Sequence, residues 1–422
     1  MGAEMYAVKT MKAPTIYDVT RRYYTVWGMY SFAGGFLFGV YPIFLHSRGL
    51  NQFQINSVLA TYFVVLFITD VPTGAFADLL GRRRSYVLGA TLRVCAFILY
   101  FFAHHYYVFL IAESIDGIGT TFGNGAIDAW GVDALDDAGY VGLKDRLFSR
   151  VAQLSAGGFM VSAMIGAYIA DIDIGLPWLL GAAGYLISGV VGFYLMHDER
   201  AREVRHKISA IPREVTTRVV SGIRVGLGAR NVLMLSAAGA ITFAAWAPYW
   251  VEWPVMFNES FSVGVWIIGW IYCGLSSARM IGAEISVRIQ GGESQRASRV
   301  SALVILASIM LFFAGVFGGR PYWALAMLFA MNLCTGAMQP LVQSWFNEQL
   351  ESSNRATMLS FNSTLATMGG AIGLLGAGHI ADTAGIPFEW QIGALISLAA
   401  APIYWALKPQ VSRAVAVVDS AK

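Results

Sequence analysis

Two acidic residues, Glu113 and Asp116, lie three positions apart in a strongly apolar stretch of the sequence. Residues with this spacing share one face of a helix, and ionisable groups inside a membrane are costly enough that each is a candidate functional residue. Two close carboxylates in a poorly hydrated cavity cannot both ionise cheaply, so we expect one of them to hold a proton. The pattern predicts proton coupling. The alternative is a structural ion pair with Arg93, in which neither acid exchanges protons.

The composition places these residues in a membrane protein. Only 13% of the 422 residues are charged while 56% are hydrophobic, and the mean hydropathy is +0.57. A soluble protein of this size could not bury so much apolar surface. The net charge of +3 is spread along the chain, which argues against a nucleic-acid partner. The three cysteines lie singly in apolar runs, so we expect no disulfide, metal or other cofactor.

A membrane-spanning helix needs about 20 mostly apolar residues, and twelve stretches of this kind can be marked. The predicted fold is therefore an all-α integral membrane protein whose 12 transmembrane helices form two six-helix bundles. The predicted spans are 23–45, 54–77, 84–103, 106–130, 150–171, 176–196, 232–256, 263–288, 299–317, 321–345, 356–381 and 387–407.

The basic residues predict the orientation of these spans. If both termini are cytoplasmic, 25 of the 29 Lys and Arg residues fall in cytoplasmic segments, as the positive-inside rule requires. The two halves also echo each other, since Ile169–Asp171 repeats as Ile380–Asp382, which favours parallel six-helix repeats. The predicted division is an N-terminal cytoplasmic segment (1–22), a first bundle (23–196), a basic cytoplasmic linker (197–230), a second bundle (231–407) and a cytoplasmic tail (408–422).

The loop after the second span carries a recognisable motif: Gly74, Asp78 and Gly81, followed by Arg82, Arg83 and Arg84. It resembles the GxxxD(R/K)xGR(R/K) signature of the major facilitator superfamily, the 12-helix secondary transporters, although Leu79 replaces the usual basic residue. The resemblance implies a transporter, not an enzyme, that works by alternating access.

In this interpretation the motif is part of a cytoplasmic gate. Gly74 would let two helices pack closely, and Asp78 would pair with Arg82 or with positive helix ends. Asp70 is expected to belong to the same gate, and Asp128 to extend its charge network. The alternative is that the arginines only anchor the loop at the membrane surface.

Other segments depart from the best-known members. Glu113 stands near the position where a second motif of the superfamily has Arg, and Ser162–Gly166 lacks the Gly-Pro pair of the drug antiporters, so antiport is not indicated by motif. Asp70–Gly74 and Gly125–Trp130 are similar to the second and fourth helices of a poorly characterised bacterial branch.

The resemblance also implies that helices 1, 4, 7 and 10 line a central cavity. Aromatic walls with few polar groups suit an amphipathic or aromatic small molecule, although Trp and Tyr also form belts at membrane interfaces. Arg279 and Glu284, in the eighth span, are expected to have structural roles. The cavity candidates are Tyr30, Tyr41, Asn124, Trp246, Tyr249, Glu252, Asn332 and Gln339.

These features predict a proton-coupled secondary transporter of the inner (cytoplasmic) membrane that exports an amphipathic or aromatic molecule and functions as a monomer. Its expected partners are the small-molecule substrate, protons and lipid. A proton symporter or a uniporter for a small metabolite is the alternative. A membrane-embedded enzyme or sensor is disfavoured, because the sequence shows no HExxH, GxSxG or phosphate-binding loop.

Overall fold

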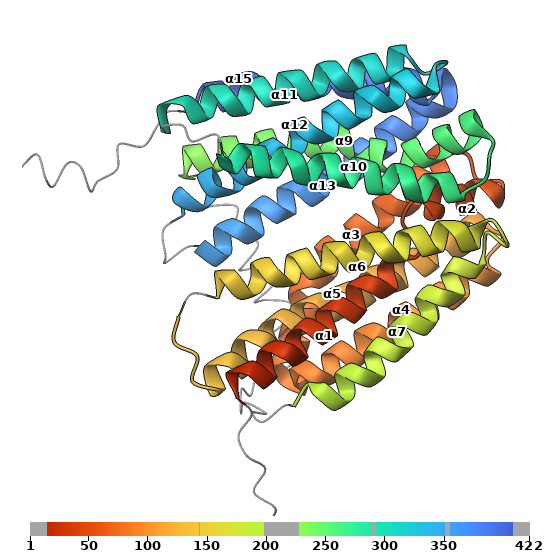
Figure 1. Cartoon of the computed structure of the whole chain (residues 1–422). Helices are drawn as coiled ribbons and strands as arrows, with labels where there is room; N and C mark the ends of the chain where they lie inside the picture. The colour runs from red at the N-terminus through yellow and green to blue at the C-terminus, as the bar shows by residue number, and fades with distance from the viewer. Residues whose placement is uncertain (1–14, 143, 198–227, 289–292, 351–354, 408–422) are drawn as a thin grey trace, which may run out of the picture.

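The structure is a computed structural model that describes residues 15–142, 144–197, 228–288, 293–350 and 355–407 (Figure 1). The central part of the predicted linker 197–230 and most of the two terminal segments lie outside these ranges. The described helices are α1 (Ile16–Gly35), α2 (Val40–Ser47), α3 (Gln52–Leu80), α4 (Arg82–Phe102), α5 (Tyr106–Asp137), α6 (Asp145–Ala170), α7 (Leu176–Leu195), α9 (Arg230–Phe261), α10 (Trp266–Arg288), α11 (Glu293–Val316), α12 (Pro321–Glu348), α13 (Arg355–Ala384), α14 (Ile386–Leu398) and α15 (Ala400–Trp405).

Ten helical segments within the described ranges are long and apolar enough to cross a membrane. The helices α5 and α10 are not among them, although they have 32 and 23 residues. Both carry charged residues in their interior, which lowers their apolar character. Since α5 packs against α3 and α4, and α10 packs against α6 and α12, both lie within the bundle. The all-α membrane fold predicted from the sequence is confirmed, and these two helices complete the predicted twelve segments.

The first and last spans are each broken, where the sequence predicted continuous helices. The first consists of α1 and α2, separated at Gly39, whose φ of 81° favours glycine. A Cβ atom added at Gly39 would lie 2.9 Å from a side-chain carbon of Ile268. The last span consists of α14 and α15, which meet at Ala399. The chain also enters α1 earlier than predicted, where Thr15 and Asp18 form a capping box.

The helices before and after the linker form two groups, α1–α7 and α9–α15, which occupy the lower and upper parts of Figure 1. They meet where α3 packs along α13, α6 along α10 and α2 against α9. We call the end of the molecule where α1 begins and α15 ends the terminal end, and the opposite end the distal end.

Two aspartates join the groups at the distal end. Asp171, just after α6, accepts hydrogen bonds from the backbone N–H groups of Val265 and Trp266 at the start of α10. Asp382, near the end of α13, accepts them from the N–H groups of Gln52 and Phe53 at the start of α3. Asp171 and Asp382 are the equivalent residues of the two repeated sequence segments. Each contacts the start of a helix in the other group, so the two contacts are equivalent under the internal repeat.

Candidate functional site

A cavity of about 400 Å³ lies mainly among the helices of the first group, and Trp250 and Val251 of α9 complete its wall. Its walls are mainly aromatic, and its charged residues are Arg93, Glu113 and Asp116. Three predicted cavity residues, Tyr30, Tyr41 and Asn124, also line it. Further aromatic lining residues are Trp27, Phe38, Tyr62, Phe97, Tyr100, Phe159, Trp178, Tyr185 and Trp250.

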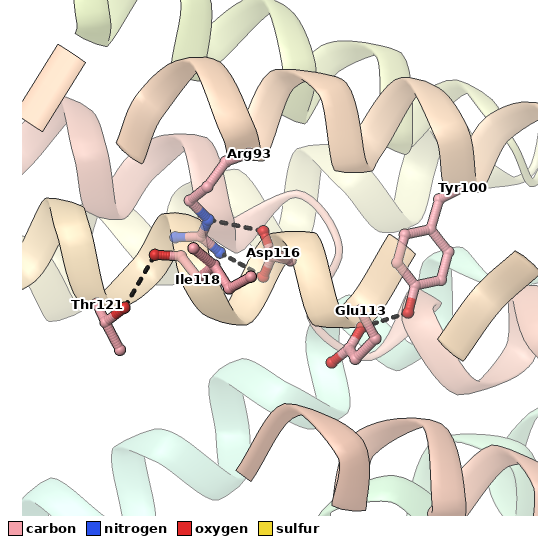
Figure 2. A network of polar contacts seen from close by, with 6 residues as sticks. All are labelled: Arg93, Tyr100, Glu113, Asp116, Ile118 and Thr121. Carbon is pink, nitrogen blue, oxygen red and sulfur yellow. Dashed lines mark hydrogen bonds and ion pairs between the residues drawn. The ribbon is translucent and has the colours of Figure 1, made fainter. Parts of the chain in front are cut away.

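Arg93 on α4 and Asp116 on α5 form a two-point ion pair (Figure 2). The Nε and Nη2 atoms of Arg93 lie 2.8 and 3.1 Å from the two carboxylate oxygens of Asp116, and the side chains are 12% and 9% exposed. The guanidinium carbon is 4.2 Å from the ring centroid of Tyr185 and 5.3 Å from that of Tyr30. Both charges are therefore compensated, and the cation is held between aromatic rings.

Two glycines place these charges within reach of each other. A Cβ atom added at Gly89 would lie 2.6 Å from the backbone oxygen of Gly119, and one added at Gly119 would lie 2.7 Å from the Cγ atom of Arg93. The absence of side chains at these positions lets α4 and α5 approach closely. The Arg93 side chain consequently lies against α5, where it meets Asp116.

Glu113 has a different environment, although it lies only one turn away on α5. It is 5% exposed and accepts a hydrogen bond from the hydroxyl of Tyr100 (Figure 2). The Tyr100 ring is stacked on Trp178, with their centroids 3.9 Å apart. None of the ion pairs between described residues includes Glu113. Of the two neighbouring acids, one is thus paired with a cation and the other with a neutral hydroxyl.

A second cavity, of about 470 Å³, lies among the helices of the second group. The predicted residues Trp246, Tyr249, Asn332 and Gln339 line it, and the amide of Asn332 donates to the Tyr249 hydroxyl at 2.9 Å. A third cavity, of about 440 Å³, lies between α6 and α10. Trp250 lines all three cavities, so they adjoin one another at this residue.

Glu252 is not among the residues that line these cavities, unlike the other predicted cavity candidates. It is fully buried and accepts hydrogen bonds from Asn56 on α3 and from the indole of Trp390 on α14, each at 3.1 Å. Glu389 is also buried and lies close enough to interact with it. Sequence reasoning did not single out Glu389, although the signal was present: an acid inside the predicted span 387–407.

The loop motif forms a local ion-pair network. An Arg82 nitrogen lies 2.7 Å from a carboxylate oxygen of Asp78, and Arg82 also lies 3.8 Å from Asp133 on α5. Gly81 joins α3 to α4 with a φ of 95°, a backbone conformation that glycine adopts without strain. The Arg83 guanidinium lies over the ring of Phe193, 4.9 Å from its centroid.

Other residues assigned to the gate lie elsewhere. Asp128 accepts hydrogen bonds from the Tyr23 hydroxyl and the Trp27 indole of α1, at 2.7 and 2.9 Å, instead of joining the arginines of the loop. A Cβ atom added at Gly74 would meet nothing within 4 Å, so the expected close packing at Gly74 is not found. Asp70 is exposed on α3, two turns before Asp78.

A bundle of many membrane-spanning helices in two groups, with adjoining cavities inside and between the groups, is the architecture of a membrane transporter. A family model described as Major Facilitator Superfamily matches residues 26–328. The chain belongs to this family, and it is therefore a transporter and not an enzyme.

Several known proteins are distantly similar. Multidrug resistance protein 2 of Bacillus subtilis (strain 168) is 22% identical over 182 residues, which are 43% of this chain and 44% of that protein. The matched region is thus less than half of the Bacillus relative. Quinolone resistance protein NorA of Staphylococcus aureus (strain MRSA252) is 19% identical over 352 residues, 82% of this chain and 86% of the relative.

Solved structures share the fold at lower identity. The nucleoside transporter NupG has a TM-score of 0.68 at 13% identity, with 92% of this chain and 98% of that chain covered. A peptide transporter POT in complex with sulfate has a TM-score of 0.70 at 13% identity, covering 94% and 95% of the two chains.

Proposed function

We propose that the protein is a proton-coupled secondary transporter that exports a small amphipathic or aromatic molecule. The observation that carries this proposal is a buried acid, Glu113, which forms no ion pair with any described residue and lies in the wall of an aromatic cavity of about 400 Å³. The volume suits a drug-sized molecule. The names of the two distant relatives, a multidrug and a quinolone resistance protein, favour export.

Glu113 is the proposed proton carrier. A buried carboxylate stays ionised cheaply only when cations or several donors surround it. The groups next to the Glu113 carboxylate are neutral hydroxyls: that of Tyr100, which donates a hydrogen bond to it, and that of Tyr41. In a closed, dry cavity the protonated form is therefore the less costly one, and water or substrate that enters the cavity changes that balance. Next to Glu113, the ion pair of Arg93 and Asp116 has no net charge and stays intact during the cycle. In this proposal the aromatic rings that pack around the Arg93 guanidinium orient the substrate.

Alternating access would arise from rocking of the two helix groups against each other. In the proposed cycle the Asp78–Arg82–Asp133 network is part of the gate at the terminal end, and Asp171 and Asp382 close the distal end. We propose that the two groups correspond to the bundles 23–196 and 231–407, that both termini are cytoplasmic and that one chain contains a complete pathway.

Uptake by symport, or uniport, is the second candidate. The specific observation in its favour is the stretch Ser162–Gly166 on α6, which has no Gly-Pro pair. The similarity in fold to nucleoside and peptide transporters is compatible with it.

The test uses the full chain in sealed liposomes that contain a pH-sensitive dye. Lipophilic cations, aromatic carboxylates and small polar metabolites are added outside in turn, with no preset gradient. In antiport, substrate that enters the liposome drives protons out, so the lumen should become alkaline. An acid shift would mean that protons enter with the substrate, and the protein would then be a symporter. Empty liposomes correct for passive permeation, and uptake without any lumenal pH change that exceeds this background would refute proton coupling.

A further inference from the structure

The guanidinium of Arg279, on α10, lines two of the cavities and has no acidic partner among the described residues. Its Nη2 atom donates to the Oε1 atom of Gln339 on α12 at 3.0 Å, and its central carbon is 5.5 Å from the ring centroid of Trp250. The ion pairs that join described residues do not include it. Arg93, by comparison, is fully paired with Asp116.

Close helix packing fixes the position of Arg279. A Cβ atom added at Gly336 on α12 would lie 2.0 Å from the backbone oxygen of Arg279, and one added at Gly282 would lie 2.0 Å from the backbone oxygen of Leu333. These two approaches hold α10 against α12 and place Gln339 beside the guanidinium. The Arg279 side chain is therefore presented from a tightly packed pair of helices and not from a mobile loop.

The charge around this residue is unbalanced. Arg279 lines both the 470 Å³ and the 440 Å³ cavities, and it is the one charged residue among the described residues that line either of them. The remaining polar lining of the larger cavity is neutral, consisting of amides such as Gln343, Asn347 and Asn362 and of hydroxyl groups. A cation in these cavities would be repelled, whereas an anion would supply the missing counter-charge.

The hydrogen-bonding capacity of the site also points to an anion. A guanidinium has five N–H donors. Among the described residues, Arg279 donates a hydrogen bond to Gln339 alone, which leaves its other N–H groups for a ligand. With its oxygen engaged in this way, Gln339 has its amide nitrogen left as a further donor. A planar carboxylate with a single negative charge matches one guanidinium, which binds it through two parallel hydrogen bonds.

We infer that Arg279, together with Gln339 and the face of Trp250, forms an anion subsite that binds the carboxylate of an amphipathic organic acid. The hydrocarbon part of the ligand lies toward Trp250, the residue that all three cavities share. This inference rests on the proposed transport function and identifies the transported substrates as organic carboxylates. It assigns a binding role to a residue for which the sequence predicted a structural one.

The test compares three probes that share one ring system and differ in charge: 2-naphthylacetate, its neutral amide 2-naphthylacetamide, and the cation 2-(2-naphthyl)ethylamine. Their dissociation constants are measured by titration calorimetry on the purified full chain in detergent. The carboxylate is expected to bind at least about tenfold more tightly than the amide, because hydrogen bonds to a charged group contribute more than those between neutral groups. If the carboxylate binds no more tightly than the amide or the amine up to its solubility limit, the inference is wrong.

Variants identify the residue responsible. Arg279→Gln is expected to remove the preference for carboxylate over amide, whereas Arg279→Lys keeps the charge and retains part of the preference. The matched control is Arg288→Gln, because Arg288 is an exposed arginine of the same helix that pairs with Glu284. A carboxylate preference that survives in a folded Arg279→Gln variant would overturn the assignment.

The binding assay needs no proton gradient, so it tests the anion subsite independently of the proton coupling that the liposome assay tests. If the anion preference is absent while the liposomes still show proton-coupled flux, only the subsite is wrong. If the preference is present while flux causes no pH change, the proton coupling is wrong and the subsite remains.

Discussion

Replacing Asp382 by Asn is expected to loosen the distal end of the molecule. The Asp382 carboxylate accepts two hydrogen bonds, at 2.8 and 3.1 Å, from the first N–H groups of α3. Such N–H groups have no partner within their own helix, and a negative charge near them is favourable. Asp171 does the same for α10. Each aspartate therefore ties one helix group to the other, and in the proposed cycle these contacts break when the distal end opens.

The magnitude follows from these contacts. Asparagine retains one carbonyl acceptor but loses the charge and the second acceptor, which costs about 1–2 kcal/mol from the charge-assisted hydrogen bond and the helix dipole. A change of that size multiplies the population of the distally open form about 5- to 30-fold. The two aspartates contact different helices, so their effects should be approximately additive in the Asp171→Asn/Asp382→Asn variant.

The assay is a spin-label distance measurement in a chain whose three cysteines, Cys95, Cys273 and Cys334, have been replaced. Labels replace Tyr107 and Tyr322, which are 74% and 77% exposed and lie at the distal starts of α5 and α12, away from the aspartates. A longer-distance population should grow in each single variant and further in the double variant.

Asp173 offers the matched control. Its carboxylate accepts from the N–H of Gly175 at 2.7 Å, a contact within the first helix group, so Asp173→Asn should leave the distances unchanged. An unaltered distribution in the double variant would refute the reasoning, and so would an equal change in the Asp173→Asn control.

Two further predictions concern stability, measured as the midpoint of thermal unfolding in detergent. Arg93→Gln should lower the free energy of unfolding by about 3 kcal/mol because it leaves Asp116 buried without its cation, and the double variant with Asp116→Asn should recover part of the loss; a double variant less stable than Arg93→Gln would contradict this. Gly282→Ala should cost about 1–3 kcal/mol through overpacking against Leu333. Gly239→Ala, where an added Cβ meets nothing within 4 Å, is its control, and equal effects of the two would argue against the close approach.

Much of the fold could be predicted from apolar length alone, because a bilayer requires helices about 20 residues long. The breaks in the first and last spans were not predicted. The one at Gly39 requires a backbone with positive φ, where an added Cβ atom would also lie 2.9 Å from a side-chain carbon of Ile268. The one at Ala399 had a signal in the sequence, because Pro402 has no N–H group to bond the carbonyl of Leu398. The helices α5 and α10 are the opposite case, because the charged residues in their interior make them too polar to be identified by apolar composition alone.

The site was only partly accessible to sequence reasoning. The cost of charge in a membrane identifies Arg93, Glu113 and Asp116 as special, but their partners depend on how α4 and α5 are rotated against each other. Only the structure shows that Asp116 forms the ion pair with Arg93, while Glu113 accepts a hydrogen bond from the Tyr100 hydroxyl. The repeat likewise marked Asp171 and Asp382 as equivalent positions. Their contacts with the starts of α10 and α3 required the packing of the two helix groups.

The central claim is that Glu113 carries the coupled proton, and one comparison in liposomes tests it most directly. A radiolabelled probe that the wild-type protein transports is followed in two modes: accumulation driven by an imposed pH gradient, and exchange with the same probe inside, which needs no net proton movement. Glu113→Gln should abolish the first while retaining the second, and Glu284→Gln, a change of an exposed acid, should alter neither. Gradient-driven accumulation that persists in Glu113→Gln would contradict the claim.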